Sequence, residues 1–202
     1  MNDLTAYILI GRSGCGKGTQ AKALIDDLTQ TNNKINSKEE NILYTETGQY
    51  FRDFIISDGY SSRLSKDLMT KSKPQPAFMA IWIWARVLVD KLKENDHVIF
   101  DGTPRSLIEA KALDTALDFY NFKKRVVIYL DVSRQWSEKK LLLRGRSDDH
   151  AEDIKARLDW FDRDVSPVLA FYKNATNYHY LTINGEQSIE SVHLDIKKDL
   201  TK

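Results

Sequence analysis

The sequence predicts an α/β fold built around a mainly parallel β-sheet. Helical patterns alternate with short apolar runs, and a glycine-rich turn follows the first of these runs. The runs lack a clean alternation of apolar and polar residues, which is typical of strands that are covered on both faces. Five such strands are expected, at Ala6–Ile10, Ile42–Thr45, His97–Asp101, Arg125–Asp131 and His179–Ile183.

Ligands of parallel sheets bind beyond the carboxyl ends of the strands, so the residues that follow each strand are the site candidates. The segment Gly11–Gln20, GRSGCGKGTQ, follows the first strand and precedes a helical pattern. Its glycines let several backbone N–H groups point inward, and the helix start adds the positive end of its dipole. Lys17 supplies a charge that reaches the β- and γ-phosphates of a nucleotide. The spacing matches the Gly-x4-Gly-Lys phosphate-binding loop, except that Gly18 comes between the lysine and Thr19.

The segment Glu46–Arg52 follows the second strand. Thr47 is the expected N-cap of the next helix, and Arg52 lies near the start of that helix. The polar segment Thr31–Asn41, which precedes the second strand, is expected to be a surface loop.

An excursion of short helices that the core does not need is predicted at 58–76, which is rich in Ser, Lys and Gly. Pro76 then begins a long apolar helix that is expected to end at about Glu94. Trp82 and Trp84 of this helix are interpreted as packing residues rather than as platforms for base stacking.

Asp101 ends the third strand and is followed by Gly102-Thr103-Pro104-Arg105. A carboxylate at this place is the Walker-B arrangement, which holds magnesium directly or through water. The alternative is a helix cap or a turn residue. Because Gly102 stands where water-activating ATPases commonly have an acidic residue, hydrolysis is not favoured as the main activity.

A helix is expected at Ser133–Leu143 after the fourth strand, followed by the charged run Arg144–Asp149. A second helix is expected from about His150 towards Pro167. A charged run of this kind is often only a solvated face. A last amphipathic helix is expected within 186–202.

The length of 202 residues suits one domain, and the net charge of +1 excludes a general attraction to nucleic acid or membrane. The most apolar stretch, 77–89, contains Arg86 and is too short to span a bilayer. No signal peptide is recognised, and Cys15 is the only cysteine, so we expect no internal disulfide and a cytoplasmic location. Cys15 is interpreted as a small residue that fills the loop rather than as a nucleophile. The four histidines are dispersed and show no metal-ligand spacing.

Cationic residues are expected to converge on the ligand side of the sheet, namely Lys17, Arg52, Arg105, Arg144, Arg146 and Arg157. Guanidinium groups bind phosphate oxygens bidentately and keep their charge. Their arrangement in two groups indicates two phosphorylated ligands, with Arg52 and Arg105 holding an acceptor phosphate. Phosphoryl transfer needs positioning and charge neutralisation, and an acceptor that is already a phosphate needs no general base.

Together these motifs resemble the adenylate kinase family of nucleoside monophosphate kinases, in its short-lid type. GRSGCGKGTQ resembles the family's phosphate loop, including the place of its threonine. TGQYFR resembles the monophosphate-binding motif Thr-Gly-Asp-x-x-Arg, and DGTPRSLIEAKAL resembles the Asp-Gly-Phe-Pro-Arg motif with its helix. RSDDHAEDIKARL resembles the segment in which two arginines flank an Asp-Asp pair, and YLTINGEQSIESV resembles the last strand and the adenine-contacting loop.

The resemblance spans nearly the whole chain and implies a five-stranded parallel sheet flanked by helices, the three-layer sandwich of P-loop NTPases. It implies transfer of the γ-phosphoryl group of ATP to a nucleoside monophosphate with Mg²⁺ and without zinc. Residues 1–202 would form one kinase domain, with an excursion for the monophosphate at about 47–76 and a minimal lid loop at about 144–150. A monomer without nucleic-acid or membrane partners is expected.

The resemblance also implies roles for single residues. The catalytic residues would be Lys17, Arg105, Arg144, Arg146 and Arg157. ATP would be bound by Gly11, Ser13, Gly14, Cys15, Gly16, Lys17, Gly18, Thr19, Lys140, Arg144 and Gln187. The monophosphate would be bound by Thr47, Gly48, Arg52, Met69, Gly102, Arg105, Glu109, Arg146 and Arg157. Asp101 would hold magnesium through water.

The chain departs from the family pattern at several places. Only Gly145 separates Arg144 from Arg146, so the lid is minimal and excludes less water when it closes. Gln49 replaces the usual Asp of the second motif, and Thr103 replaces the usual Phe of the third.

Glu109 stands where adenylate kinases have a glutamine that reads the acceptor adenine. A carboxylate accepts hydrogen bonds, which suits guanine better than adenine, whereas Thr47 favours adenine over pyrimidines. AMP is therefore the expected acceptor, with UMP, CMP and other monophosphates as alternatives. A nucleotide-sensing protein without turnover is the non-enzyme alternative. It would be expected to lack phosphate-binding arginines, and this sequence keeps them.

Overall fold

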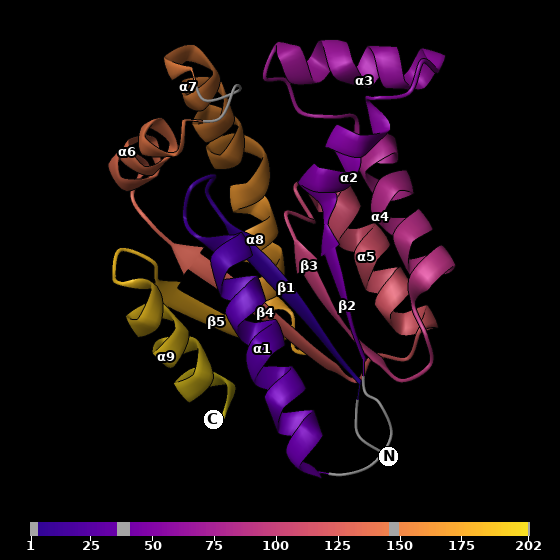
Figure 1. Cartoon of the computed structure of the whole chain (residues 1–202), viewed down its shortest axis with the longest axis vertical. Coiled ribbons are helices and arrows are strands. Elements are labelled where there is room, and N and C mark those ends of the chain that lie inside the picture. The colour runs from indigo at the N-terminus through magenta and orange to yellow at the C-terminus, as the bar shows by residue number, and fades with distance from the viewer. Residues whose placement is uncertain (1–3, 36–40, 146–149, 202) are drawn as a thin grey trace.

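A single parallel sheet forms the centre of the molecule in the computed structural model, which describes residues 4–35, 41–145 and 150–201 (Figure 1). The strand order is β2-β3-β1-β4-β5, and all neighbouring strands run parallel. The five predicted strands are therefore confirmed. Their bounds are β1 Thr5–Gly11, β2 Asn41–Glu46, β3 Asp96–Asp101, β4 Lys124–Asp131 and β5 His179–Asn184.

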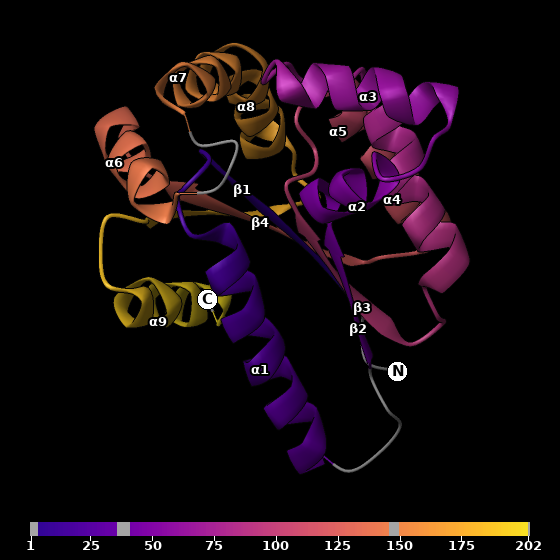
Figure 2. The same ribbon diagram turned by 45° about the horizontal axis from the view of Figure 1, so that its top comes forward.

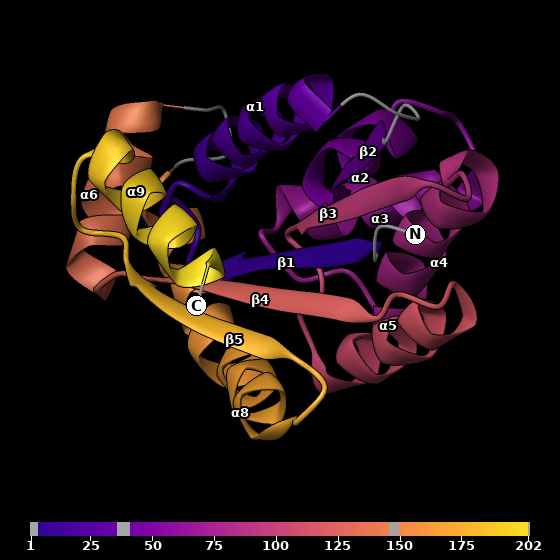
Figure 3. The same cartoon turned by 90° about the horizontal axis from the view of Figure 1, so that it is seen from below.

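Helices cover both faces of the sheet. Figure 3 shows α1 and α9 on one face and α5 and α8 on the other, where α4 also packs. The described helices are α1 Lys17–Ile35, α2 Thr47–Phe54, α3 Tyr60–Thr70, α4 Ala77–Lys91, α5 Leu107–Phe119, α6 Arg134–Arg144, α7 Ala151–Trp160, the π-helix η1 Phe161–Val165, α8 Ser166–Asn174 and α9 Ile189–Leu200. No helix in these ranges is both long and apolar enough to cross a bilayer.

The central strand β1 shows why the sequence pattern lacks alternation. Ala6, Ile8 and Ile10 enter the core with α4, α5 and α8, whereas Tyr7 and Leu9 enter the core with α1 and α9. Successive side chains of a strand point to opposite faces, and here both faces are buried. The strand is thus held rigidly from both sides, and so is the turn that follows it.

The path of the chain creates a crevice beyond the carboxyl end of β1. The chain goes from β1 to β2 at one edge of the sheet, returns through β3 beside β1, and then crosses to β4 on the other side. A reversal of this kind is the switch point at which parallel sheets bind ligands.

Two local predictions are corrected. Thr47 is not an N-cap, because α2 begins at Thr47 itself and its N-cap is Glu46, without a side-chain capping bond. The Thr47 hydroxyl lies 2.7 Å from the hydroxyl of Thr103, and both residues are buried, so a distant partner replaces the local one. The segment Thr31–Asn41 is not all loop, since α1 continues to Ile35 and β2 starts at Asn41. An established helix adds residues at little cost, so a polar composition does not end it.

The predicted helix that begins near His150 extends beyond Pro167. Residues 151–174 form one continuous helical rod, in which the π-helical turn η1 joins α7 to α8. Pro167 lies in the first turn of α8, where a missing N–H is tolerated. The rod brings its first half above the crevice and packs its second half against the sheet (Figure 1).

Two arms flank the crevice. One arm contains α2 and α3, and the other contains α6 and α7, with α3 and α7 side by side at the mouth (Figures 1 and 2). The Ser72 hydroxyl, just after α3, donates a 2.6 Å hydrogen bond to Oδ1 of Asp153 on α7. This bond joins segments that are 81 residues apart in the sequence.

The contact between α1 and α9 generates a prediction about stability. The Oδ2 atom of Asp27 on α1 lies 2.8 Å from Nζ of Lys197 and 2.8 Å from Nε2 of His193, both on α9. The hydrogen bond from Lys197, and then that from His193, lowers the pKa of the Asp27 carboxyl in the folded protein. We expect Asp27→Asn to lower the free energy of unfolding at neutral pH by about 0.5–1 kcal/mol.

The pH dependence has a defined sign. A lowered carboxyl pKa stabilises the fold above the ordinary value of about 4 and loses this effect as the pH falls through the folded-state value. Urea unfolding of both proteins should therefore give a gap that is largest at neutral pH and narrows below about pH 4. Asp67→Asn, in an exposed pair with Lys71 on α3, is the matched control and should change stability less. A gap that widened towards acid would contradict the assignment.

Candidate active site

A cavity of about 1010 Å³ lies in the crevice, between the two arms. The turn after β1, the ends of β2 and β3, and residues of α6, α7 and η1 form its walls. It thus gathers residues from segments that lie far apart in the sequence. The predicted site residues that line it are Gly11, Ser13, Gly14, Cys15, Gly16, Lys17, Gly18, Thr19, Gly48, Arg52, Met69, Asp101, Gly102, Arg105, Lys140, Arg144, Arg157 and Gln187.

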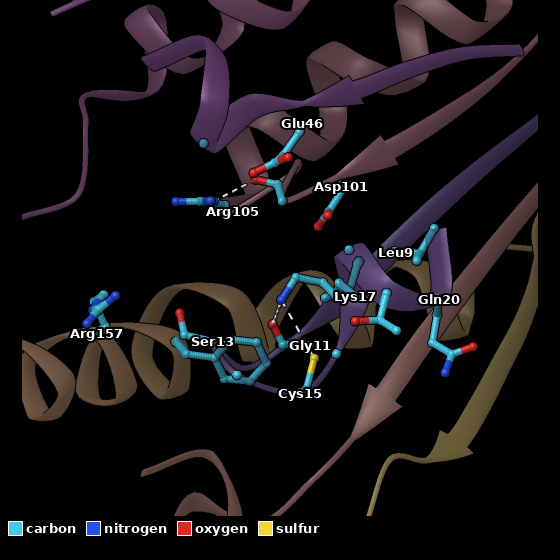
Figure 4. Close-up of a pocket in the computed structure, with 18 of the residues that line it drawn as sticks. Leu9, Gly11, Ser13, Cys15, Lys17, Gln20, Glu46, Asp101, Arg105 and Arg157 are labelled. Atoms are coloured by element: carbon cyan, nitrogen blue, oxygen red, sulfur yellow. Dashed lines mark hydrogen bonds between the residues drawn. The ribbon is translucent and has the colours of Figure 1, made fainter. Parts of the chain in front are cut away.

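The glycine-rich turn has the backbone conformation that its sequence predicts. Gly14 and Gly16 have φ angles of +83° and +95°, which L side chains rarely adopt. Cys15 between them is buried, as expected of a residue that fills the loop. Lys17 begins α1, and its ammonium group donates to the carbonyl oxygen of Gly11 at 2.7 Å (Figure 4). It also donates to the carbonyl oxygen of Arg12 at 3.1 Å. The lysine therefore lies folded over the loop, at the positive end of a helix.

Arg12 belongs to the loop, but its guanidinium contacts other parts of the protein and Arg12 does not line the cavity. Its guanidinium donates to the carbonyl oxygen of Val132 at 2.9 Å and to Asp162 at 2.6 Å, and it lies 4.9 Å from the ring centre of Phe161. These contacts tie the loop to the π-helical turn of the rod. Arg12 thus fixes the loop relative to the α7 arm.

Two arginines converge at the start of α2. A Cβ atom on Gly48 would lie 3.4 Å from Nη1 of Arg52 and 3.8 Å from Nη2 of Arg105. Arg105 is oriented by a 2.6 Å bond from its Nε to the carbonyl oxygen of Gly102, and its guanidinium lies 5.5 Å from the ring centre of Trp160. The bare backbone at Gly48 leaves room for an anion between the two cations.

Asp101 ends β3 beside the loop, with one carboxylate oxygen 3.4 Å from the place of a Cβ on Gly18. The hydroxyl of Tyr44 donates to the same oxygen at 3.0 Å. Burial and the Asp101 charge raise the pKa of Tyr44 well above its usual range, so the phenol remains a donor. In Figure 4, Asp101 and Glu46 reach into the cavity from one side, with Lys17 on the other.

The residues near Asp101 fit a magnesium ion that is shared with phosphates. The described residues contain no group of three or more His, Cys, Asp or Glu side chains placed to hold a metal ion, zinc included. Magnesium is commonly bound by one or two carboxylates together with water and phosphate oxygens. Asp101, at the mouth of the phosphate loop, can provide such a carboxylate.

The α6–α7 arm brings further cations to the cavity. Arg144 is the last residue of α6, and the C-cap residue Gly145 follows it with a φ of +63°. Arg157 of α7 lines the cavity, and its Nε donates to the backbone oxygen of Asp153 at 3.3 Å. Arg146 was also predicted to act here, but it lies outside the described residues.

The far end of the cavity, beyond the loop, is lined by Lys140 and Gln187. The Lys140 ammonium lies 4.7 Å from the ring centre of Trp136, one turn earlier on α6. The Gln187 side chain donates to the carbonyl oxygen of Asn184 and to Asp195, both at 2.9 Å. This leaves Lys140 and Trp136 as a mixed cationic and aromatic wall.

Among the described residues of the predicted monophosphate site, two do not line the cavity. Thr47 is 2 % exposed and pairs with Thr103. Glu109 is 3 % exposed, in the first turn of α5, and accepts a 3.3 Å bond from the Ser106 hydroxyl. Burial raises the pKa of the Glu109 carboxyl, and the charge of Arg105 acts in the opposite direction. Direct base reading by Glu109 therefore has no support from its position.

Several residues of the cavity wall were not predicted from the sequence, among them Tyr44, Glu46, Trp136 and Trp160. Tyr44 and Glu46 lie at the carboxyl end of the second predicted strand, so the strand-end rule could have indicated them. Trp136 lies one turn from Lys140 on the predicted helix. Trp160 had no signal, because only the fold of the rod brings it to Arg105.

A phosphate loop, a carboxylate at the end of the adjacent strand and arginines on both arms define a P-loop phosphotransferase. The adenylate kinase family model matches residues 9–177. An adenylate kinase of Prochlorococcus marinus strain MIT 9515 is 32% identical over 193 residues, which cover 96% of this chain and 97% of the relative. An adenylate kinase of Parabacteroides distasonis is 31% identical over 195 residues, covering 95% of each chain. The chain belongs to the adenylate kinase family and is a nucleoside monophosphate kinase, a phosphotransferase with a phosphate group as acceptor.

The close packing under the loop generates a prediction. A Cβ on Gly11 would lie 2.6 Å from Sγ of Cys15 and 2.8 Å from the backbone oxygen of Leu130. We expect Gly11→Ala to destabilise the fold by about 1–3 kcal/mol, because the backbone oxygen cannot move aside. Thermal unfolding measures the effect. Gly59→Ala, whose Cβ would meet only the Ser62 hydroxyl at 3.4 Å, is the control. Equal melting temperatures for the two variants would contradict the prediction.

Proposed function

We propose that this protein is an adenylate kinase that transfers the γ-phosphoryl group of ATP to AMP. One observation carries the proposal: a single cavity has a phosphate loop with Lys17 at one side and the converging pair Arg52 and Arg105 at the other. Two phosphorylated ligands, one held at each side, would meet between them. The printed names of the relatives support adenosine nucleotides as the two ligands.

The donor triphosphate would lie over the loop. Backbone N–H groups around Gly14 and Gly16 would bind its phosphates, and Lys17 would exchange its carbonyl partners for phosphate oxygens. The donor base would extend towards Lys140, Trp136 and Gln187, which line that end of the cavity. This arrangement orients the γ-phosphoryl group towards the start of α2.

The acceptor would place its phosphate beside Gly48, where the two guanidinium groups converge. Its base would lie near Phe51, Met69 and Gln75, which line the same arm of the cavity. A phosphate acceptor is already anionic at neutral pH, so no residue has to remove a proton from it. Catalysis then consists of alignment and charge neutralisation.

Magnesium would be held by Asp101 through its water shell, and Tyr44 would orient that carboxylate. When bound, the ion neutralises charge on the phosphates. Arg144 and Arg157 of the other arm would supply the remaining positive charge to the phosphoryl group in transfer. Closing the two arms would also exclude water from the reaction.

A coupled assay of ADP formation from ATP with AMP, GMP, UMP, CMP and dTMP in turn tests the proposal. AMP should give the highest kcat/KM. Turnover with GMP and none with AMP would overturn the acceptor assignment but not the family.

Loss of charge at either side of the cavity should abolish most of the activity. We expect Lys17→Met and Arg105→Ala to lower kcat/KM by about two to three orders of magnitude, because each removes a preorganised cation from the reacting phosphates. Melting temperatures should stay near that of the wild type. Arg63→Ala removes an exposed arginine that bonds only the backbone oxygen of Asp58 among the partners found, and it is the control. Near-normal turnover of either site variant would remove the assigned role.

Gly48→Ala separates binding from folding. Alanine is favoured over glycine in helices, so the fold should keep its melting temperature. The new methyl group would lie between Arg52 and Arg105, so the KM for AMP should rise about tenfold or more while the KM for ATP stays unchanged. Steady-state kinetics with each substrate varied in turn decides this. A rise confined to ATP would place the acceptor elsewhere.

A further inference from the structure

We propose that Glu46 is a positioning residue, which holds Arg52 in the orientation that binds the acceptor phosphate; this inference rests on the proposed function. Glu46 ends β2 and is the register partner of Asp101 at the end of β3. Its side chain lines the cavity, and Figure 4 shows it reaching in beside Asp101 and Arg105. None of the roles assigned above uses this carboxylate.

The Arg52 guanidinium is held by two partners. Nη2 donates to Glu46 Oε1 at 2.8 Å and to Gln49 Oε1 at 2.7 Å, and Nε donates to the same Gln49 oxygen at 3.0 Å. The amide of Gln49 is itself oriented, because its Nε2 donates to Asp53 at 2.8 Å. Gln49 therefore takes the Nε–Nη2 edge of Arg52, and Glu46 accepts the second hydrogen of Nη2.

The Nη1 atom of Arg52 faces the acceptor side. Nη1 lies 3.4 Å from the place of a Cβ on Gly48, and Nη2 of Arg105 lies 3.8 Å from the same place. Glu46 thus bonds Nη2 and not Nη1. By holding Nη2, it directs Nη1 towards the space that Arg52 shares with Arg105.

Holding Arg52 in place has a thermodynamic purpose. The Arg52 side chain is 39% exposed, and a long exposed side chain samples many rotamers unless it is fixed. Fixing it before the ligand arrives lowers the entropic cost of binding. Gln49 is neutral, so Glu46 is the partner that adds an ion pair to the hydrogen bond.

A simple electrostatic view predicts the opposite role. A carboxylate near an anionic phosphate weakens phosphate binding, so removal of its charge alone would tighten binding. The two views therefore predict changes of opposite sign in the KM for AMP when the Glu46 carboxylate is removed.

The experiment compares Glu46→Ala, which removes the acceptor oxygen, with Glu46→Gln, which keeps an oxygen at the same reach. We expect Glu46→Ala to raise the KM for AMP about three- to tenfold, because one charge-assisted hydrogen bond to Arg52 is lost. The kcat should stay within about twofold, since Arg52 holds the phosphate in ground and transition states alike. The KM for ATP should not change, and Glu46→Gln should lie closer to the wild type than to Glu46→Ala.

Calorimetric titration with AMP in the absence of ATP gives a second readout that does not depend on turnover, and the dissociation constant should rise in parallel. Glu94→Ala, at an exposed site before β3, is the control. An unchanged or lower KM and dissociation constant in Glu46→Ala would overturn the proposal. Equal weakening of AMP binding in Glu46→Ala and Glu46→Gln would overturn it too. A wild-type protein that phosphorylates no monophosphate would instead refute the proposed function.

Discussion

Repulsion between two phosphorylated ligands is the constraint on which the architecture of this site depends. Two unit charges 4 Å apart repel by about 1 kcal/mol in bulk water and by about 4 kcal/mol near a protein surface. In the proposed mechanism, backbone N–H groups of the loop, Lys17 and arginines from both arms oppose this repulsion. Arginine suits this task because it keeps its charge at any physiological pH.

The sheet provides the fixed part of this arrangement. Parallel register places the ends of β2, β3 and β1 at one level, so that Glu46 pairs with Asp101 and Asp101 pairs with Leu9. Both faces of β1 are buried, and the loop after it is further tied by Arg12 to Asp162. The phosphate cradle is therefore rigid, while the arginines Arg52, Arg144 and Arg157 come from the arms.

The sequence was sufficient to predict the strands, the phosphate loop and five cationic residues of the cavity, whereas the predicted Arg146 lies outside the described residues. The strands and the loop were predictable because they depend on local patterns. An apolar run buried on both faces looks the same wherever its neighbours lie, and glycine spacing determines a turn directly. Asp101 was predictable for the same reason, since it ends such a run.

Features that depend on partners far away in the sequence were predicted wrongly or not at all. Thr47 looked like a cap from its neighbours, but its hydroxyl pairs with Thr103, 56 residues away. Tyr44 reaches Asp101 across 57 residues, and no local pattern indicates that bond. Glu109 was placed by analogy with a motif, yet its burial in the first turn of α5 depends on packing that the motif does not describe.

The short connection between α6 and α7 limits how that arm moves. Leu141 of α6 packs with Ile154 and Leu158 of α7 in a small apolar cluster of their own. Five peptide units join Gly145 to His150, a tether that extends to roughly 18 Å at most. Because of this packing and this short tether, the two helices are expected to move together. In the proposed mechanism, Arg144 and Arg157 would then approach the phosphoryl group in transfer at the same time.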